Sequence, residues 1–374
     1  MKIFNVVVSA GACRTSGAKT IFMQFLEHLR EWGTGSRYYI FVDKNVICPE
    51  IDGVEYIKID VKNGFKRIKF DYWDCRMLLA IKGIIPDLII SLQNTGITCL
   101  KNIPQIIYYH QPLPIYPQHW NPLRCDERTL AFYKWIYPFF IKISYKKNNV
   151  DFVAQIQFIK DGIINRFNIN PDHVHVLFPD VEKVNIENLK FYKFEPGTYN
   201  FLYPAVNVKY KNHLLLPEMM IELANYNERY SKNVRIHLTI SSSDNPVLLR
   251  KIKEYGLSHN FVFHGVITHQ DLLSMYSSCH GLLFPSTIET LGLPLIEAGR
   301  FGVGIIASDL DYAHQVMGNY QGIFYEDANN APDWARQLLT LCLEKPQRFP
   351  YLKEREYSSW CDFFRLVNQK LICR

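Results

Sequence analysis

The feature that most constrains the fold is an alternation of short apolar runs with amphipathic segments, which continues along most of the 374 residues. The apolar runs at 3–9, 37–43 and 104–110 have the length of buried strands. The segment 18–33 carries an apolar stripe at helical spacing and ends at Gly33. Strands that alternate with helices predict parallel, doubly wound sheets, so we expect an α/β protein.

The alternation stops once and then starts again. The polar segment between the two halves has proline and glycine near its end, which is typical of a linker. Near the C-terminus, a helical stripe follows that need not belong to the second half. We therefore expect an N-terminal domain over 1–182, a linker over 183–199, a second Rossmann-like domain over 200–349 and a C-terminal helical segment over 350–374. Two such domains would face a central cleft at the carboxyl ends of their strands, where ligands bind in open α/β sheets.

The composition limits the class of protein. Apolar residues make up 48% of the chain, and none of the apolar runs reaches about 18 residues without a charge, so we expect no membrane-spanning helix. The 9 cysteines form no CxxC pair, so we expect free thiols of a reducing compartment rather than a zinc site. The net charge of +6 suits an anionic ligand or membrane surface but falls short of a nucleic-acid signature. We expect the first residues, MKIFNVVVSAGA, to form a strand rather than a signal peptide.

The densest signal is the segment 284–308, FPSTIETLGLPLIEAGRFGVGIIAS. Glu289 and Gly292 follow an apolar run, Pro294 stands near the first helical position, and Glu297 lies about one turn into the helix. A glycine lets a ligand approach the backbone closely, and the amides at a helix start favour an anion. Carboxylates accept hydrogen bonds from sugar hydroxyls. The segment therefore predicts a phosphate seat with a carboxylate on either side.

This segment resembles the E-x7-E signature of retaining GT-B glycosyltransferases of family 4, the glycosyl transferases group 1. Glu289 and Glu297 are eight positions apart, inside the frame P-S-x-x-E-x-x-G-L-P-x-x-E-A. The segments 203–223, 261–286 and 358–367 are also similar to stretches of that family. The resemblance implies a donor domain in the second half, an acceptor domain in the first, and a final helix that crosses back to the first domain.

The resemblance also implies roles for particular residues. Glu297 would bind the ribose hydroxyls of the donor nucleotide, and Glu289 would lie near the transferred sugar and the distal phosphate. Lys211 would neutralise the diphosphate, and His110 would line the reaction centre; with Glu289 they are the candidate catalytic residues. The donor would further contact Gly11, Val266, Ile267, Thr290, Leu291, Gly292 and Leu293.

The chain departs from the family pattern in two loops. The first loop reads SAGA where the family usually has two glycines, and the usual Gly-Arg pair before the lysine is absent. The second phosphate cation would then be missing, or would come from elsewhere, with Lys209 and Arg14 as candidates. A lysine with helix-start amides can stabilise a leaving diphosphate, and no DxD-type pair lies in the expected loops, so we expect no metal or other cofactor. His173 and His175 share a strand face, but no third ligand is near in sequence, so we do not expect a metal there.

We therefore expect a retaining, metal-independent hexosyltransferase. It would move a sugar from a nucleotide-diphosphate sugar to a carbohydrate or lipid-linked acceptor, in cell-surface polysaccharide or glycolipid synthesis. The alternatives are a sugar-nucleotide epimerase or hydrolase of the same fold, and a non-catalytic nucleotide-sugar-binding subunit. A dinucleotide-dependent oxidoreductase does not fit, because the first loop, GACRTSG, lacks the G-x-G-x-x-G spacing.

A basic, aromatic stretch occupies residues 128–149. It holds five cations and seven aromatic residues but no acid. This composition suits the headgroup region of an anionic membrane, and the alternative is a helix packed on the first domain with a solvated lysine edge. We expect a cytoplasmic protein in peripheral contact with the cytoplasmic face of the membrane through 128–149, and no nucleic-acid partner.

Overall fold

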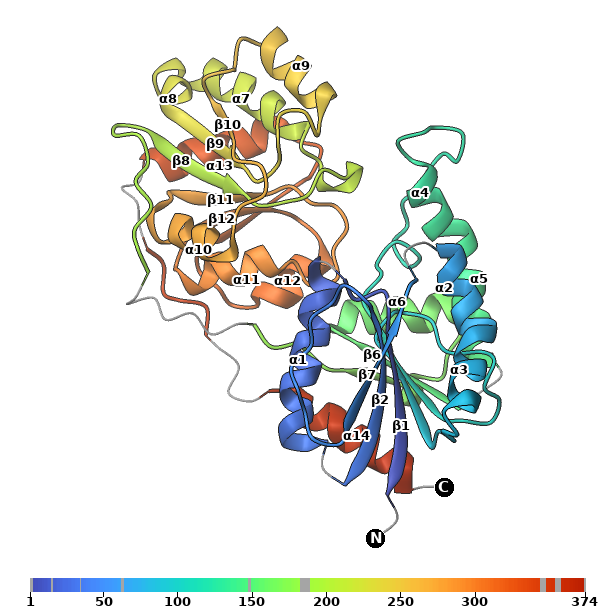
Figure 1. The fold of residues 1–374 in the computed structure, drawn as a ribbon. Coiled ribbons are helices and arrows are strands. Elements are labelled where there is room, and N and C mark those ends of the chain that lie inside the picture. Colours follow the sequence, from blue (N-terminus) through green and yellow to red (C-terminus); the bar gives the residue numbers. More distant parts are fainter. Residues whose placement is uncertain are drawn as a thin grey trace. The chain divides into compact units, whose positions relative to one another are not determined.

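The structure is a computed structural model that describes residues 3–14, 16–33, 35–61, 64–146, 149–181, 189–343, 348–353 and 358–372. It divides into unit 1, residues 1–180 with 356–374, and unit 2, residues 181–355 (Figure 1). Each unit contains one parallel sheet with helices, so the predicted two-domain Rossmann-like α/β fold is confirmed. Residues 183–188 of the predicted linker lie outside the described residues. None of the described helices has both the length and the apolar character that a membrane span requires.

The sheet of unit 1 has the strand order β3-β2-β1-β4-β5-β6-β7. Its strands are β1 (Phe4–Ala10), β2 (Ser36–Asp43), β3 (Val54–Ile59), β4 (Leu88–Ser91), β5 (Gln105–Tyr109), β6 (Val150–Ala154) and β7 (Val174–Val176). The chain builds outward from β1 to β3 and then returns to place β4 on the other side of β1. The carboxyl ends of β1 and β4 therefore form a topological switch point, the usual position of a ligand in such sheets.

Helices cover both faces of this sheet, because successive residues of a strand point to opposite sides. The helical segments of unit 1 are α1 (Ser16–Trp32), α2 (Gly64–Lys69), η1 (Phe70–Asp74), α3 (Cys75–Ile81), α4 (Arg128–Ala131), η2 (Phe132–Ile136), α5 (Tyr137–Lys146), α6 (Gln157–Phe167), η3 (Pro171–His173) and α14 (Trp360–Ile372). Val6 and Val8 of β1 join the core beneath α1 and α14, and Val7 joins the core beneath η1 and α3.

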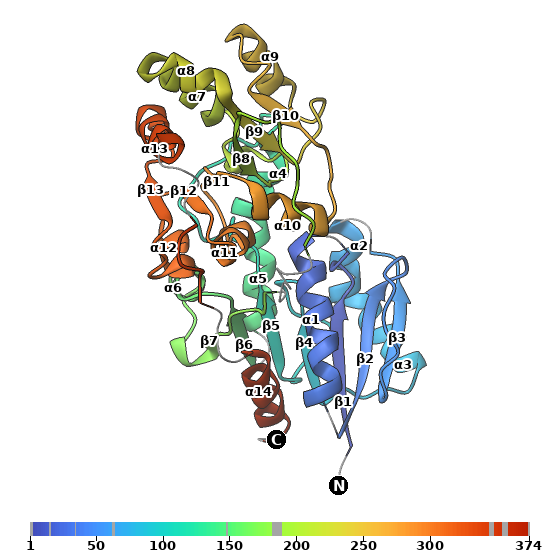
Figure 2. The ribbon, with the colours of Figure 1, turned by 90° about the vertical axis from the view of Figure 1, so that its left-hand side faces the viewer.

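The C-terminal helix α14 is part of the core of unit 1. It runs beside α1 in both ribbon views (Figures 1 and 2). The ring of Phe364 stacks on Phe25 of α1 at 5.7 Å, and Trp360 stacks on Tyr108 of β5 at 5.9 Å. Helix α14 therefore packs on the sheet of unit 1, although more than 170 residues of unit 2 separate it in sequence from the rest of unit 1.

The sheet of unit 2 has the order β10-β9-β8-β11-β12-β13. Its strands are β8 (Tyr199–Tyr203), β9 (Val234–Leu238), β10 (Phe261–Phe263), β11 (Gly281–Phe284), β12 (Gly304–Ser308) and β13 (Ile323–Glu326). Its helical segments are η5 (Lys209–Lys211), α7 (Leu215–Tyr226), α8 (Glu228–Asn233), α9 (Pro246–Glu254), α10 (His269–Ser278), α11 (Leu293–Arg300), α12 (Asp311–Met317) and α13 (Ala331–Leu343). The switch point lies between β8 and β11, so the loops that follow these two strands emerge next to each other.

Candidate functional site

The loops after β8 and β11 are hydrogen-bonded to each other in unit 2. The backbone N–H and the hydroxyl of Thr287 donate to the carbonyl of Tyr210 at 2.8 and 3.1 Å. Next to this contact, Lys211 Nζ donates to Glu289 Oε1. The two side chains are 14% and 13% exposed, and Lys211 Nζ lies 5.7 Å from the ring of Phe284. The structure thus brings together two of the three predicted catalytic residues, which are 78 positions apart in the sequence.

The backbone around Lys211 is held by buried aromatic residues. The hydroxyl of Tyr203 donates to the carbonyl of Lys211, and the ring of His213 packs 4.9 Å from the ring of Tyr203. Burial, with a smaller effect from Lys211, lowers the pKa of His213 to about 4. His213 is therefore neutral at pH 7, and Lys211 carries the positive charge at this point.

The turn before α11 has the shape predicted from Gly292. This residue caps the helix with φ +69°, in the left-handed region, and a Cβ there would lie 3.3 Å from Leu295 Cδ1. Leu291 is buried, while Thr290 and Leu293 are half-buried. Among the described residues, no side chain caps the start of α11. Pro294 has no N–H and the N–H of Leu295 donates to the carbonyl of Gly292, so an anion seat at this helix start rests on the amide of Leu293 and remains a prediction.

Glu297 lies one turn into α11 and is 12% exposed. Its Oε1 is 3.0 Å from Nε2 of His269, the first residue of α10. Sequence analysis did not select His269, although it falls inside the family-like segment 261–286. Val266 is 98% exposed and Ile267 is half-buried, on the loop that leads into α10.

His110 belongs to unit 1 and follows β5. Its backbone N–H donates to Asn94 Oδ1 at 2.6 Å, and Asn94 Nδ2 lies 3.4 Å from His110 Nε2. His110 Nδ1 is buried without a hydrogen-bond partner among the described residues. Burial and the charge of Arg67 lower the pKa of His110 to about 4, so the imidazole is neutral at pH 7. Asn94 has φ +67°, and such left-handed residues other than glycine gather at functional sites.

Gly11 lies in a tightly packed turn. A Cβ at this position would lie 2.7 Å from Val61 Cγ2 and 2.8 Å from Ile59 Cδ1. The turn is also fixed by the N–H of Ala12, which donates to Gln93 Oε1 at 3.0 Å. A side chain at this position would thus require Val61 and Ile59 to shift, and the contact of Gly11 with the donor remains a prediction.

The loop after β8 lacks the arginine expected from the family pattern, and side-chain amides hold it. Asn207 Nδ2 donates to the carbonyl of Asp244 at 2.5 Å, and Asn207 Oδ1 accepts from Asn245 Nδ2 at 2.8 Å. Of the two alternative cations, Arg14 lies 3.9 Å from the buried Asp43, in unit 1. A second phosphate cation from Lys209 or Arg14 remains a prediction.

The described residues contain no group of three or more histidine, cysteine, aspartate or glutamate side chains arranged to hold a metal ion. His173 and His175 instead approach a carboxylate that is distant in sequence. His173 Nδ1 lies 2.6 Å from Asp151 Oδ1, and Lys370 Nζ of α14 lies 2.5 Å from Asp151 Oδ2. These contacts lower the pKa of Asp151 to about 2 against the opposing effect of burial. The cluster is an ion-pair network that connects α14 to the sheet.

The family model of the glycosyl transferases group 1 matches residues 185–356. The serotype-specific mannosyltransferase WbdA of Escherichia coli is 36% identical over 78 residues, which are 21% of this chain and 10% of WbdA. The O-antigen chain mannosyltransferase RfbU of Salmonella typhimurium is 24% identical over 204 residues, which are 54% of this chain and 53% of RfbU. The chain therefore spans about half or less of these relatives.

Solved structures share the whole architecture. WaaG, a glycosyltransferase involved in lipopolysaccharide biosynthesis, superposes with a TM-score of 0.67 at 13% identity, over 97% of this chain and 95% of WaaG. Anabaena HepE, in complex with UDP and glucose, gives a TM-score of 0.65 at 12% identity, over 99% of this chain and 100% of HepE. At these identities the likeness concerns the fold, and it defines a GT-B protein. The chain thus has the GT-B fold, and its second half is similar to the glycosyl transferases group 1 over 185–356.

Proposed function

We propose that the protein is a retaining glycosyltransferase that moves a hexose from a nucleotide-diphosphate sugar to a carbohydrate or lipid-linked acceptor, in cell-surface polysaccharide or lipopolysaccharide synthesis. One observation carries the proposal: Lys211 and Glu289 form a largely buried ion pair beside the uncapped start of α11.

The chemistry assigned to these groups is electrostatic. As the nucleoside diphosphate leaves, negative charge grows on its phosphates, and Lys211 with the amides of α11 would stabilise it. Glu289 would exchange its bond with Lys211 for hydroxyls of the transferred sugar, and Glu297 would exchange its bond with His269 for ribose hydroxyls. These groups supply the needed charge, so we propose transfer without a metal or other cofactor. His110, neutral and with an unbonded Nδ1, is the group in unit 1 that we assign to the reaction centre.

We propose a mannosyl donor as the first to test, because the matched relatives WbdA and RfbU are named as mannosyltransferases. The experiment is a thermal-shift panel of UDP-, GDP-, ADP- and CDP-sugars that includes mannose, glucose and galactose. A ligand at about 100 times its Kd stabilises the folded state by about 2.7 kcal/mol. A panel without any stabilising sugar nucleotide would contradict the proposal.

Glu297→Gln tests the ribose contact of the donor. We expect the donor Kd to rise at least tenfold, about 1.4 kcal/mol, in calorimetry, because Gln is a weaker acceptor than a carboxylate. The matched control is Glu228→Gln, which neutralises an exposed glutamate of the same unit. An unchanged Kd in Glu297→Gln would remove Glu297 from the donor site.

Turnover tests the reaction itself. We expect Lys211→Ala to lower turnover about 100-fold or more, and we expect EDTA to leave the wild-type rate unchanged. The anomeric configuration of the product, read by NMR, tests retention. Normal turnover in Lys211→Ala would mean that another cation stabilises the leaving diphosphate, and product formation without any acceptor would favour the hydrolase alternative.

We also propose peripheral contact of residues 128–149 with an anionic membrane at its cytoplasmic face. The structure limits which residues of this stretch can contact a membrane. Lys134 and Tyr137 are buried, whereas Trp135, Phe139 and Lys142 are exposed. Part of the stretch is thus core, as the alternative interpretation predicts. Residues 147 and 148 and the side chain of Lys146 lie outside the described part of the chain.

Vesicle flotation tests this contact. We expect binding to anionic vesicles that weakens with salt without vanishing, because each lysine contributes about 1 kcal/mol that salt screens, while inserted aromatic rings do not respond to salt. Replacing Lys142, Lys146 and Lys147 with Glu should abolish it. The control reverses three exposed cations of unit 2: Lys232, Arg250 and Lys253. Wild-type protein that stays off anionic vesicles at low salt would refute the contact.

A further inference from the structure

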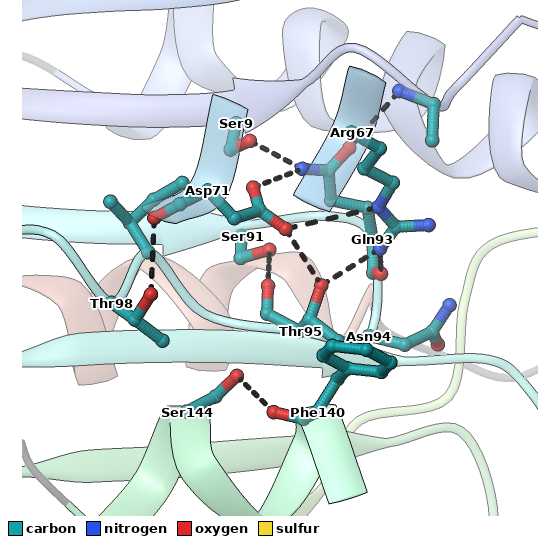
Figure 3. A network of polar contacts seen from close by, with 12 residues as sticks. Ser9, Arg67, Asp71, Ser91, Gln93, Asn94, Thr95, Thr98, Phe140 and Ser144 are labelled. Atoms are coloured by element: carbon teal, nitrogen blue, oxygen red, sulfur yellow. Dashed lines mark hydrogen bonds and ion pairs between the residues drawn. The ribbon is translucent and has the colours of Figure 1, made fainter. Parts of the chain in front are cut away.

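A second polar cluster lies at the switch point of unit 1, at the carboxyl ends of β1 and β4 (Figure 3). Arg67, from α2, is its centre. Its Nη2 donates to the carbonyl of Gln93, to Thr95 Oγ1 at 2.9 Å and to the hydroxyl of Tyr137 at 3.2 Å. Three acceptors from two separate segments thus fix one guanidinium in a single orientation.

The same guanidinium keeps one nitrogen free of protein acceptors. Nη1 points away from the network in Figure 3, and within the described residues it has no hydrogen-bond partner. The Arg67 side chain as a whole is 17% exposed. A fixed guanidinium with a free N–H edge is the group that proteins use most often to recognise phosphate oxygens.

The charge of Arg67 is only weakly compensated. The nearest carboxylate is Asp71, whose Oδ2 lies 4.0 Å from Arg67 Nε, beyond hydrogen-bond distance. Burial raises the pKa of Asp71 to about 7, although Arg67 and Thr95 act in the opposite direction. Lys134 is also buried, donates to the carbonyl of Tyr116, and has no carboxylate within ion-pair distance among the described residues.

Backbone irregularities gather around the same cluster. Asp71 lies in η1, and Tyr137 directly follows η2; these are the two π-helical turns of the described chain. Asn94, between Gln93 and Thr95, is the left-handed residue that binds His110. Single π turns and left-handed residues persist where a side chain must be aimed at a ligand, because regular backbone would be more stable.

We propose that Arg67 binds a phosphate group of the acceptor at the switch point of unit 1. The site would take a phosphorylated sugar or a lipid-linked phosphate, since both present the same oxygens. Asp71, Gln93, Thr95 and Tyr137 act as positioning residues that hold the guanidinium. This inference depends on the proposed transfer reaction in one respect: it calls the ligand an acceptor. The anion site itself is inferred from the geometry of unit 1 alone.

The test is calorimetric titration of the full chain with inorganic phosphate, followed by glucose 6-phosphate and by dodecyl phosphate below its micelle concentration. Comparison of the last two probes distinguishes the two sources of the phosphate. We expect saturable binding that Arg67→Gln weakens by roughly tenfold or more, because one charge-assisted contact is lost. Arg76→Gln, which removes an exposed cation on α3, is the matched control and should leave the affinity unchanged.

Two further variants keep the result decisive. Tyr137→Phe leaves the charge of Arg67 in place but removes one of its hydrogen-bond acceptors. We therefore expect it to lower the affinity for phosphate by less than Arg67→Gln does. This variant still tests the site if Arg67→Gln folds poorly. Lys211→Ala should lower donor affinity and leave in place the phosphate binding that Arg67→Gln removes, whereas Arg67→Gln should weaken that binding and spare donor affinity. Loss of probe binding in Lys211→Ala alone would assign the phosphate to unit 2 and overturn the proposal, as would the absence of binding in the wild type. Normal donor binding in Lys211→Ala and Glu297→Gln, with probe binding lost in Arg67→Gln, would refute the proposed function but not this site.

Discussion

The Lys211–Glu289 pair can be tested apart from any activity, through the stability of unit 2. Lys211→Met keeps the length of the side chain and its contact with Phe284 but leaves Glu289 without its cation. Exposed ion pairs contribute about 0–1 kcal/mol, and breaking a fully buried pair costs about 3–5 kcal/mol. The side chains of this pair are 14% and 13% exposed, between those limits but nearer the buried one. We therefore expect Lys211→Met to lower the free energy of unfolding by about 2 kcal/mol.

The assay is scanning calorimetry or urea unfolding of the ligand-free protein. A loss of about 2 kcal/mol should lower the melting temperature of a domain of this size by roughly 4–8 °C. Adding Glu289→Gln should restore a large part of the loss, because the orphaned carboxylate is then neutral. The coupling energy of the double-mutant cycle should be about 1–2 kcal/mol. The control is the exposed pair Lys232–Glu228, whose side chains are 66% and 73% exposed, so Lys232→Met should change stability by less than about 0.5 kcal/mol.

One result would refute the reasoning. If Lys211→Met is as harmless as Lys232→Met and the double variant shows no coupling, the lysine and the carboxylate do not share a desolvated pocket. Lys211, which we assign to the stabilisation of the leaving diphosphate, would then be an ordinary surface lysine.

Three other measurements follow from the structure. Gly292→Ala should destabilise unit 2 by more than Gly256→Ala. Both positions have φ +69°, where an alanine costs about 1–2 kcal/mol, but of the two only Gly292 has neighbours within 4 Å of the added Cβ; equal losses in urea unfolding would contradict this. Burial holds the pKa of His213 at about 4, below its ordinary value of 6.5, so the unfolded chain takes up a proton that the folded chain refuses, and stability falls as the pH drops below 6.5. His213→Phe should therefore reduce the difference in unfolding free energy between pH 7 and pH 5 by about 2 kcal/mol, and a pH profile identical to wild type would refute it. Lys370→Met should destabilise unit 1 by about 2 kcal/mol at pH 7, because the buried Asp151 loses its cation, whereas Arg365→Met on the exposed side of α14 should have little effect. The stabilisation from Asp151, whose folded pKa is lowered from 3.8 to about 2, is present above about pH 4 and is lost as the pH falls towards 2.

The sequence by itself was sufficient for the α/β architecture and for the turn around Gly292. Both depend on information that is local in the chain. Apolar periodicity favours a strand or a helix, and a glycine followed closely by a proline favours a left-handed cap at a helix start. The eight-residue spacing of Glu289 and Glu297 is local in the same sense, since one loop and one helical turn separate them. The resemblance to a known family added site residues that lie far from this segment in the sequence, namely Lys211 and His110.

Only the tertiary structure decided which distant residues meet. Lys211 reaches Glu289 across 78 positions and Arg67 reaches Gln93 across 26, because parallel strands bring their carboxyl ends to one edge of a sheet. Composition made 128–149 look uniformly basic, yet Lys134 is buried while Lys142 is exposed. Residues 132–136 form a π-helical turn, and no periodic pattern in the sequence predicts such a turn. Burial, charge pairing and the resulting pKa values are properties of the packed chain, which is why the proposal for Arg67 depends on the structure.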